Sequence, residues 1–160
     1  EDYNHIKVAS IARQVVEEGG LVQAGGHGQL NGICTHWEMW RFVQGGMKPI
    51  DALRCGTILG ARYVGLDGDI GSLEVGKLAD IIVMEQDADP LKNIRDTERV
   101  QYTIVNGRIY ESATMTQYGT QEPTEFFWRV TGNGLSFPVP VATGCSCSRN
   151  GAANMTWQTP

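Results

Sequence analysis

The sequence predicts an α/β fold over about residues 1–66, followed by a small β unit over residues 67–112. In the first part an amphipathic helix, a glycine turn, a short apolar strand and a glycine-rich loop follow one another, which is one step of an α/β protein. After Gly65 short β-branched runs separated by turns replace the helical periodicity. Neither the helical nor the strand periodicity continues after residue 112, and residues 113–160 are expected to form a poorly ordered or extended tail.

Charge and composition exclude several classes of partner. The chain has 160 residues, enough for one domain with a core, and a net charge of −5 without a basic block. Nucleic acid is therefore not expected as a partner. No apolar stretch approaches the roughly 20 residues that span a bilayer, so no membrane partner is expected either. The sequence opens on Glu1 without an initiator Met or a signal peptide, as a piece of a longer protein would, and nothing indicates a compartment.

The four cysteines form no readable framework. Cys34 and Cys55 lie in apolar surroundings and are expected to be buried as small hydrophobes. Cys145 and Cys147 lie in a polar stretch without a second Cys or His pair to complete a zinc site.

The first expected helix covers residues 3–18 and ends at Gly19-Gly20, because a C′ glycine ends helices. Its buried face is expected to consist of Val8, Ile11, Ala12, Val15 and Val16. A short strand over residues 21–24 and a glycine-rich loop over residues 25–29 follow.

The second helix is expected to run from Thr35 to about residue 44, because Thr35 and Glu38 fit the capping-box pattern. A third helix is expected over residues 49–64, with Pro49 in its first turn. It is apolar on most sides and should be buried.

Two glycines interrupt this third helix, Gly56 and Gly60. Each costs about 1 kcal/mol relative to alanine in a helix interior. Because they are four residues apart and share a face, a close approach of a neighbouring backbone is expected there.

Residues 71–84 combine a turn with a short apolar strand. Gly71 and Gly76 permit the turn, and Lys77 and Asp80 are expected to brace it as a charged pair.

A hairpin is expected further along the chain. Asn106-Gly107 lies between β-rich runs at residues 100–105 and 108–110, which is the strongest local signal for a type I′ turn.

Four sequence blocks resemble the C-terminal portion of metal-dependent amidohydrolases of the imidazolonepropionase- and prolidase-like group. The blocks are Pro-Ile-Asp-Ala-Leu-Arg at 49–54, Gly-Ala-Arg-Tyr-Val-Gly-Leu at 60–66, the turn and strand at 71–84, and Val-Asn-Gly-Arg at 105–108. The sequence is also similar to the amidohydrolase part of large bacterial proteins that carry a TolB-like propeller ahead of it. The resemblance covers about residues 3–111. It implies the last strand–helix units of an incomplete (β/α)8 barrel, followed by part of a small β-sandwich.

The resemblance also implies where a site would lie. Active sites of such barrels lie at the C-terminal ends of the strands, which here means the loop after residues 21–24. The family's last strand normally delivers an aspartate that binds the metal and accepts a proton from water, and His27 occupies that place. His27 is therefore the candidate catalytic residue and metal ligand, since imidazole can bind a metal or act as a base near pH 7. The alternative is a histidine that hydrogen-bonds its own loop.

Three residues of the following helix are further candidates. His36 and Trp37 are candidate substrate-binding residues, and Glu38 is a candidate carboxylate that orients His27. Each has a structural alternative. His36 can be a surface or capping residue, Trp37 can pack with Trp40 in a core or interface, and Glu38 can close the capping box.

The resemblance implies a divalent metal, zinc in first place, in the complete protein. This chain has no His-x-His pair, and its only histidines are His5, His27 and His36. Because a catalytic zinc needs three protein ligands and a water, the chain alone is not expected to be an active metallohydrolase.

Two functions remain open from the sequence. One is the C-terminal fragment of an amidohydrolase that cleaves an amide-type C–N bond, other than that of cytidine, in a peptide-like or cyclic substrate by metal-activated water. The other is a truncated, non-catalytic remnant that acts as an interaction or structural module. In either case the bare edges of a strand at residues 21–24 predict self-association.

Overall fold

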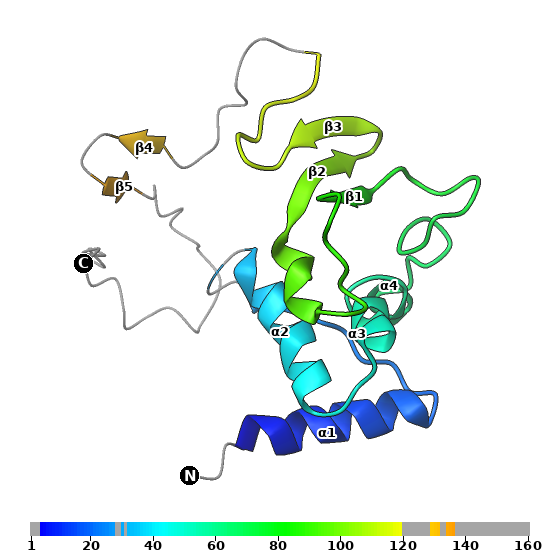
Figure 1. Cartoon of the computed structure of the whole chain (residues 1–160). Helices are drawn as coiled ribbons and strands as arrows, with labels where there is room; N and C mark the ends of the chain where they lie inside the picture. Colours follow the sequence, from blue (N-terminus) through cyan, green and yellow to red (C-terminus); the bar gives the residue numbers. More distant parts are fainter. Residues whose placement is uncertain (1–3, 28–29, 31, 120–128, 132–133, 137–160) are drawn as a thin grey trace, which may run out of the picture. The chain divides into compact units, whose positions relative to one another are not determined.

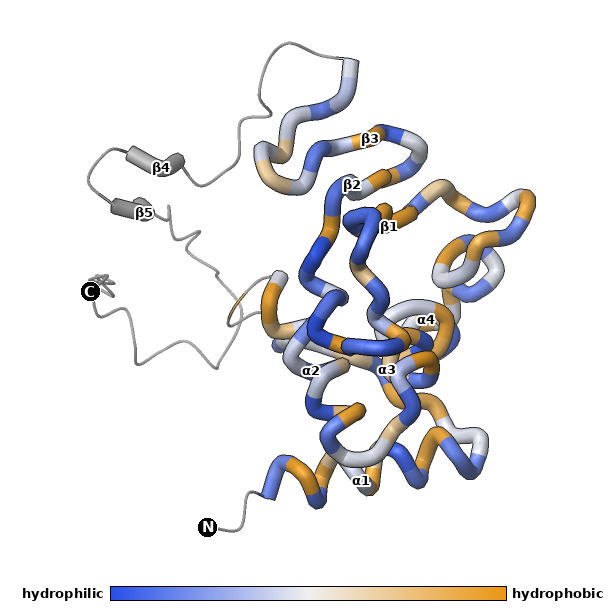
Figure 2. The backbone as a smooth tube through the Cα atoms, viewed as in Figure 1, coloured by the Kyte–Doolittle hydropathy of each residue, from blue (hydrophilic) through white to orange (hydrophobic). Residues whose placement is uncertain are grey.

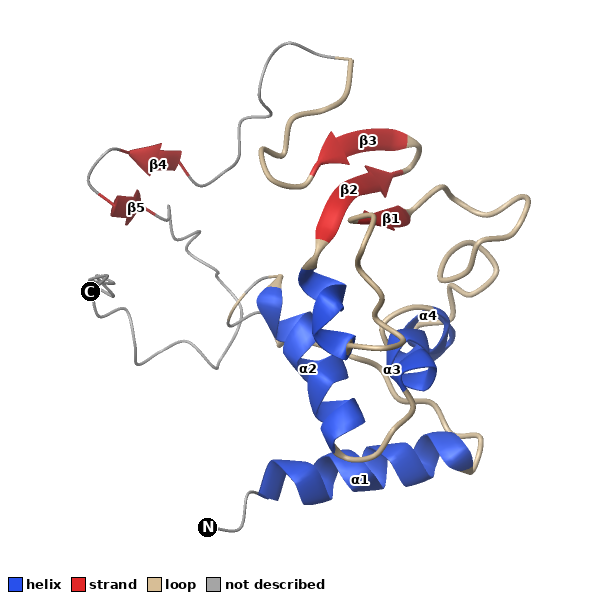
Figure 3. Ribbon diagram, viewed as in Figure 1, coloured by secondary structure: helices blue, strands red, loops and turns tan. Residues whose placement is uncertain are grey.

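The computed structural model describes residues 4–27, 30, 32–119, 129–131 and 134–136. The chain divides into two units, Glu1–Glu122 and Pro123–Pro160. The helices and strands that the structure describes in the first unit are, in chain order, α1 (Asn4–Glu17), α2 (Ile33–Gln44), α3 (Pro49–Cys55), α4 (Ile58–Tyr63), β1 (Ile81–Met84), the 3-10 helix η1 (Ile94–Glu98), β2 (Val100–Val105) and β3 (Arg108–Glu111) (Figures 1 and 3). Among the described helices, none is long and apolar enough to cross a membrane.

In the second unit the structure describes one antiparallel hairpin, formed by β4 (Arg129–Thr131) and β5 (Gly134–Ser136). The expected tail over residues 113–160 lies largely outside the described residues, as do Cys145 and Cys147, and the predicted domain boundaries stay predictions.

Helix α1 ends as predicted but buries a different face. Gly19 has a φ of 81°, and its N–H donates to the Val16 carbonyl at 3.0 Å. The buried side belongs to the small residue Ala9, whereas Val8 and Ile11 are 65% and 58% exposed. Figure 2 shows apolar and polar residues alternating along this helix.

The reason for this orientation is a close helix crossing. A Cβ on Gly45, just after α2, would lie 2.5 Å from the backbone and 2.6 Å from the Cβ of Ala9. Only a small residue on each helix permits this approach. Figure 1 shows α1 passing across this end of α2. The predicted face was therefore wrong for Val8, Ile11 and Val15, which are exposed, and right for the half-buried Ala12 and Val16.

The predicted strand over residues 21–24 is not formed. The segment has no regular secondary structure, and its one backbone hydrogen bond within the described residues runs from the Ala24 N–H to the Cys55 carbonyl at 3.0 Å. A strand requires a neighbour that pairs with it residue by residue. The described part of the chain places no strand beside this segment.

Helix α2 begins at Ile33, before the predicted start at Thr35. Its N-cap is Gly32, with a φ of 84° and no side-chain capping bond, so the predicted capping box was wrong. Glu38 instead faces Arg41, at 3.5 Å between Oε1 and Nη1. The predicted end at Gln44 is confirmed.

The predicted helix over residues 49–64 is broken in two. Pro49 opens α3 as expected, but the helix stops at Cys55, and α4 starts at Ile58. A Cβ at Gly56 would lie 3.0 Å from the Met39 sulfur, so a side chain of α2 packs directly against the break.

The core lies between α2, α3 and the segment before β2. Its buried members are Ala24, Met39, Phe42, Met47, Ala52, Cys55 and Ile94. Cys55 is fully buried, as predicted, and burial raises its thiol pKa to about 11, so this cysteine packs as an unreactive hydrophobe. Cys34 is half-buried and unbridged.

The β unit is a three-stranded antiparallel sheet in the order β1-β2-β3. The predicted type I′ turn is confirmed, with φ angles of 47° at Asn106 and 78° at Gly107. Ile81, Ile104 and Ile109 lie opposite one another across the three strands.

Lys77 and Asp80 brace two separate turns and do not pair with each other. The Lys77 ammonium donates to the Asp67 carbonyl and the Ser72 hydroxyl, both at 2.6 Å. The Asp80 carboxylate accepts from the Asn106 N–H at 2.7 Å. The predicted charged pair was therefore wrong, although both residues do stabilise turns.

Candidate functional site

His27 lies on the exposed loop that follows residues 21–24. Its φ of 49° is unusual for a residue other than glycine, and such conformations cluster at functional sites and in turns. The neighbouring Gly26 anchors the loop, because a Cβ there would lie 2.5 Å from the Cys34 Cβ and 3.3 Å from the Thr35 backbone nitrogen. The loop therefore packs against the first turn of α2 and presents His27 to solvent.

His36 lies on α2 and is half-buried. Within the described residues its Nδ1 is buried without a hydrogen-bond partner. Burial lowers the pKa of this imidazole, and the negative charge of Glu98 opposes the shift. His36 therefore lies on the side of α2 that faces η1, and its lowered pKa favours the neutral imidazole.

Trp37 and Glu38 lie beside it. Trp37 is 37% exposed, and Glu38 is half-buried with Arg41 as its ion-pair partner. The substrate-binding roles of His36 and Trp37, and the role of Glu38 in orienting His27, remain predictions.

A polar contact that the sequence analysis missed lies on the same helix. The Trp40 indole Nε1–H donates to the Thr97 hydroxyl at 2.9 Å, and Thr97 in turn donates to the Ile94 carbonyl at 2.9 Å. The Arg95 guanidinium carbon lies 5.3 Å from the centre of the Trp40 ring. The sequence signal for this contact is the tryptophan itself, because a buried indole N–H usually has a hydrogen-bond partner.

The described residues do not by themselves fit a metal centre. No group of three or more His, Cys, Asp or Glu side chains among them is arranged to hold a metal ion. A catalytic zinc needs three protein ligands. His27 would require donors from elsewhere.

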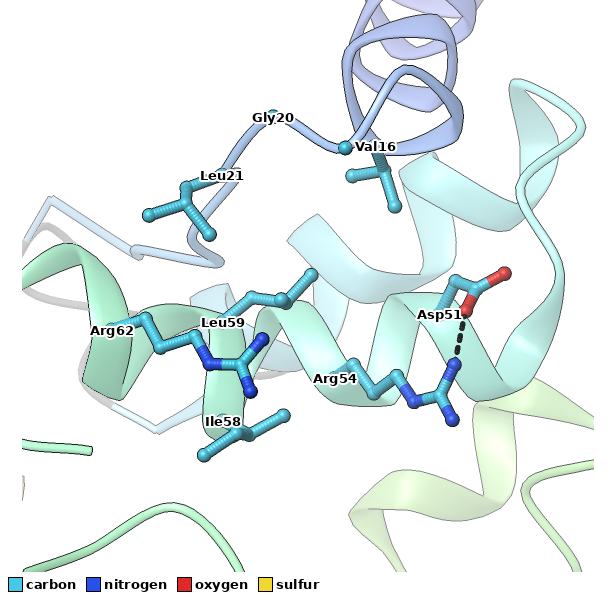
Figure 4. Close-up of a pocket in the computed structure, with 9 residues that line it drawn as sticks. Val16, Gly20, Leu21, Asp51, Arg54, Ile58, Leu59 and Arg62 are labelled. Atoms are coloured by element: carbon cyan, nitrogen blue, oxygen red, sulfur yellow. Dashed lines mark hydrogen bonds and ion pairs between the residues drawn. The ribbon is translucent and has the colours of Figure 1, made fainter. Parts of the chain in front are cut away.

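A pocket of about 460 Å³ lies away from His27, between the end of α1 and helices α3 and α4 (Figure 4). Its lining residues are Val16, Gly19, Gly20, Leu21, Asp51, Arg54, Ile58, Leu59 and Arg62. None of the predicted site residues belongs to it.

Comparison with known proteins gives the chain a family. Residues 13–110 match the amidohydrolase family. An imidazolonepropionase from Symbiobacterium thermophilum is 46% identical over 78 residues, which cover 46% of this chain and 18% of that protein.

Two solved structures of prolidase-type proteins are also similar to this chain. A Xaa-Pro dipeptidase with bound methionine in its active site superimposes with a TM-score of 0.57 at 28% identity, over 66% of this chain and 26% of that one. A protein described as a prolidase from Bifidobacterium longum gives a TM-score of 0.55 at 31% identity, over 74% of this chain and 28% of that one.

The chain thus spans between about a fifth and somewhat more than a quarter of the length of these relatives, 18% to 28%. The family and these structures imply a TIM-barrel-like α/β fold, of which the described residues show helices and a small antiparallel sheet. The incomplete (β/α)8 barrel and the small β-sandwich stay predictions. Members of the family are in general metal-dependent hydrolases of C–N bonds, and on the match over residues 13–110 this chain belongs to the amidohydrolase family.

Proposed function

We propose that this chain forms the C-terminal part of an amidohydrolase that hydrolyses an amide-type C–N bond in a peptide-like or cyclic amide substrate. The observation that carries the proposal is the asymmetry of coverage. The Bifidobacterium longum protein matches 74% of this chain, whereas the chain covers only 28% of that protein. Most of the matched fold, and any donors on it, would come from other segments.

In this proposal His27 lies at the rim of the active site. Its exposed imidazole lies on the loop after residues 21–24 and can accept a hydrogen bond or serve as a general acid–base group. Trp37, on the adjoining helix, would offer an aromatic wall to the substrate, with His36 beside it. The divalent metal that the family generally uses finds no sufficient donor set among the described residues, so its ligands would come largely from other segments.

The decisive observation is the reading frame upstream of Glu1. A His-x-His motif after a strand in that frame supports the proposal, and its absence sinks it. The extended protein should then be assayed with Xaa-Pro dipeptides and cyclic amides.

His27→Ala in the extended protein tests the assigned residue. Loss of a positioned acid–base group typically lowers the rate by about 10²- to 10⁴-fold. His5→Ala is the control, since His5 is an exposed histidine at the start of α1 that the proposal does not place in the site. Equal activity of both variants would remove His27 from the site.

A second candidate function is a non-catalytic interaction or structural module. The absence of a three-donor group among the described residues favours it, as does a histidine where the family normally has an aspartate. Metal analysis of the purified 160-residue chain discriminates the two. Stoichiometric, tightly bound zinc would argue against this module, whereas a metal-free and partly unfolded chain would support it.

A further inference from the structure

The pocket between α1, α3 and α4 has the dimensions of a small-molecule site. Its volume of about 460 Å³ falls within the range of roughly 300–1,000 Å³ that ligand pockets usually have. Four apolar side chains supply much of its wall: Val16, Leu21, Ile58 and Leu59. Such a wall favours the hydrocarbon part of a ligand.

Arg54, Arg62 and Asp51 supply the charged part of the lining. The Arg54 Nη1 donates to the Asp51 carboxylate at 3.0 Å. The Arg62 Nε lies 3.7 Å from the Asp67 carboxylate, a distance too long for a hydrogen bond. Within the described residues the two terminal nitrogens of Arg62 have no hydrogen-bond partner. Figure 4 shows the Arg62 side chain running beside Leu59 and Ile58.

Geometry, not net charge, selects the kind of anion. Arg54 and Arg62 carry two positive charges, and the paired Asp51 and Asp67 carboxylates offset them. The lining therefore attracts no anion by net charge, and recognition depends on directed hydrogen bonds. A single carboxylate can accept two parallel hydrogen bonds from the fork of the two terminal nitrogens of one guanidinium, here that of Arg62, because their spacing matches its two oxygens.

We infer that this pocket binds a small monocarboxylate with an apolar body, held by Arg62 and packed against Ile58 and Leu59. The site is distinct from the loop of His27, which does not line it. The inference does not rest on the hydrolysis proposed above, so either can fail alone.

The test is an NMR titration of the full chain with three probes of one shape: phenylbutyrate, phenylbutanol and phenylbutylamine. Phenylbutyrate is expected to bind saturably in the millimolar range and to shift the methyl signals of Ile58 and Leu59. The alcohol and the amine are expected to bind about tenfold more weakly or worse, because they lack the charge-assisted hydrogen bonds. Equal affinity of the three probes, or no saturable binding of phenylbutyrate, overturns the inference.

Substitutions of single arginines test which side chain binds the carboxylate of phenylbutyrate. Arg62→Gln is expected to weaken phenylbutyrate binding by about tenfold, whereas Arg62→Lys keeps the charge without the fork and loses less. Arg41→Gln is the matched control, since Arg41, like Arg62, is an exposed arginine paired with a carboxylate, here that of Glu38, and it should change affinity by less than about twofold. An equal loss in Arg41→Gln and Arg62→Gln would overturn the inference. The comparison of probes on the unaltered chain decides the question even if a variant fails to fold.

Discussion

At the scale of single residues, Trp40 joins the helical part of the chain to the segment that leads into the sheet. The Trp40 indole N–H donates to the Thr97 hydroxyl, and the Arg95 guanidinium lies over the indole ring. Trp40 also packs against the buried core residues. Thr97 is only 5% exposed, so its hydroxyl depends on protein partners. Of the two tryptophans of α2, Trp40 therefore has a structural role, which leaves the more exposed Trp37 as the candidate for contact with a ligand.

Trp40→Phe should lower the free energy of unfolding by about 1 kcal/mol, because it removes one buried hydrogen-bond donor while keeping most of the ring. Trp37→Phe serves as the control, with an expected change below about 0.5 kcal/mol, since Trp37 lies at the surface. Urea denaturation followed by circular dichroism measures both. Equal losses would mean that the Trp40–Thr97 bond contributes nothing of its own.

His36 should give the folded state a pH dependence. Its folded pKa lies below the ordinary value of 6.5, so the unfolded chain binds more protons just below that pH. The free energy of unfolding should therefore rise with pH between the lowered pKa and about 6.5, and fall as the medium is acidified through that window.

The measurement is a series of urea unfolding curves across that window. In His36→Asn this part of the pH dependence should disappear, because asparagine does not titrate. His5→Asn, at the exposed start of α1, should retain it. A His36→Asn curve with the same slope as the unaltered chain would contradict the assignment.

At the scale of elements, the β2–β3 hairpin depends on backbone angles that only a few residues tolerate. Gly107 has a φ of 78°, and the turn is held from outside by the Asp80 carboxylate. Gly107→Ala should therefore destabilise the protein by about 1–2 kcal/mol, the cost of a left-handed conformation for a residue with a Cβ.

Gly68→Ala is the matched control in another turn. A Cβ there would meet nothing within 4 Å, and Gly68 has no positive φ. Its unfolding midpoint should stay close to that of the unaltered chain. Thermal unfolding of the two variants gives the two midpoints. Equal midpoints would show that the left-handed conformation at Gly107 does not limit the stability of the protein.

The elements that could be predicted are those whose signals are local. The glycine stop after α1, the strand β1 and the Asn106-Gly107 turn depend on residues within a few positions of one another. Gly56 shows why the predicted long helix failed, since its break coincides with the approach of Met39 from another helix. Such contacts leave no trace in helical periodicity.

At the scale of the whole molecule, the same limit applies to the candidate site. Family resemblance points to the loop of His27 as a site, which stays a prediction, and residue spacing could not tell which way His36 would face. That direction depends on the packing of α2 against η1, far apart in the chain. The strand predicted at residues 21–24 failed for a related reason, because a strand exists only with a partner beside it.

That unpaired segment makes self-association the expected behaviour of the isolated chain. Within the described residues, the backbone of residues 21–23 has no backbone hydrogen-bond partner, and such groups invite pairing with another chain. On α1, Val8 and Ile11 are exposed apolar side chains, whose burial against a second copy would be favourable.

Size-exclusion chromatography with light scattering should therefore show a dimer or larger species that grows with protein concentration. Val8→Glu combined with Ile11→Glu should shift the distribution toward the monomer, because two charges on the contact oppose its burial. Leu91→Glu, an equally simple change on an exposed turn before η1, should leave the distribution unaltered. A compact monomer at every concentration would count against association, and would mean that the chain satisfies the backbone of residues 21–23 without a second copy.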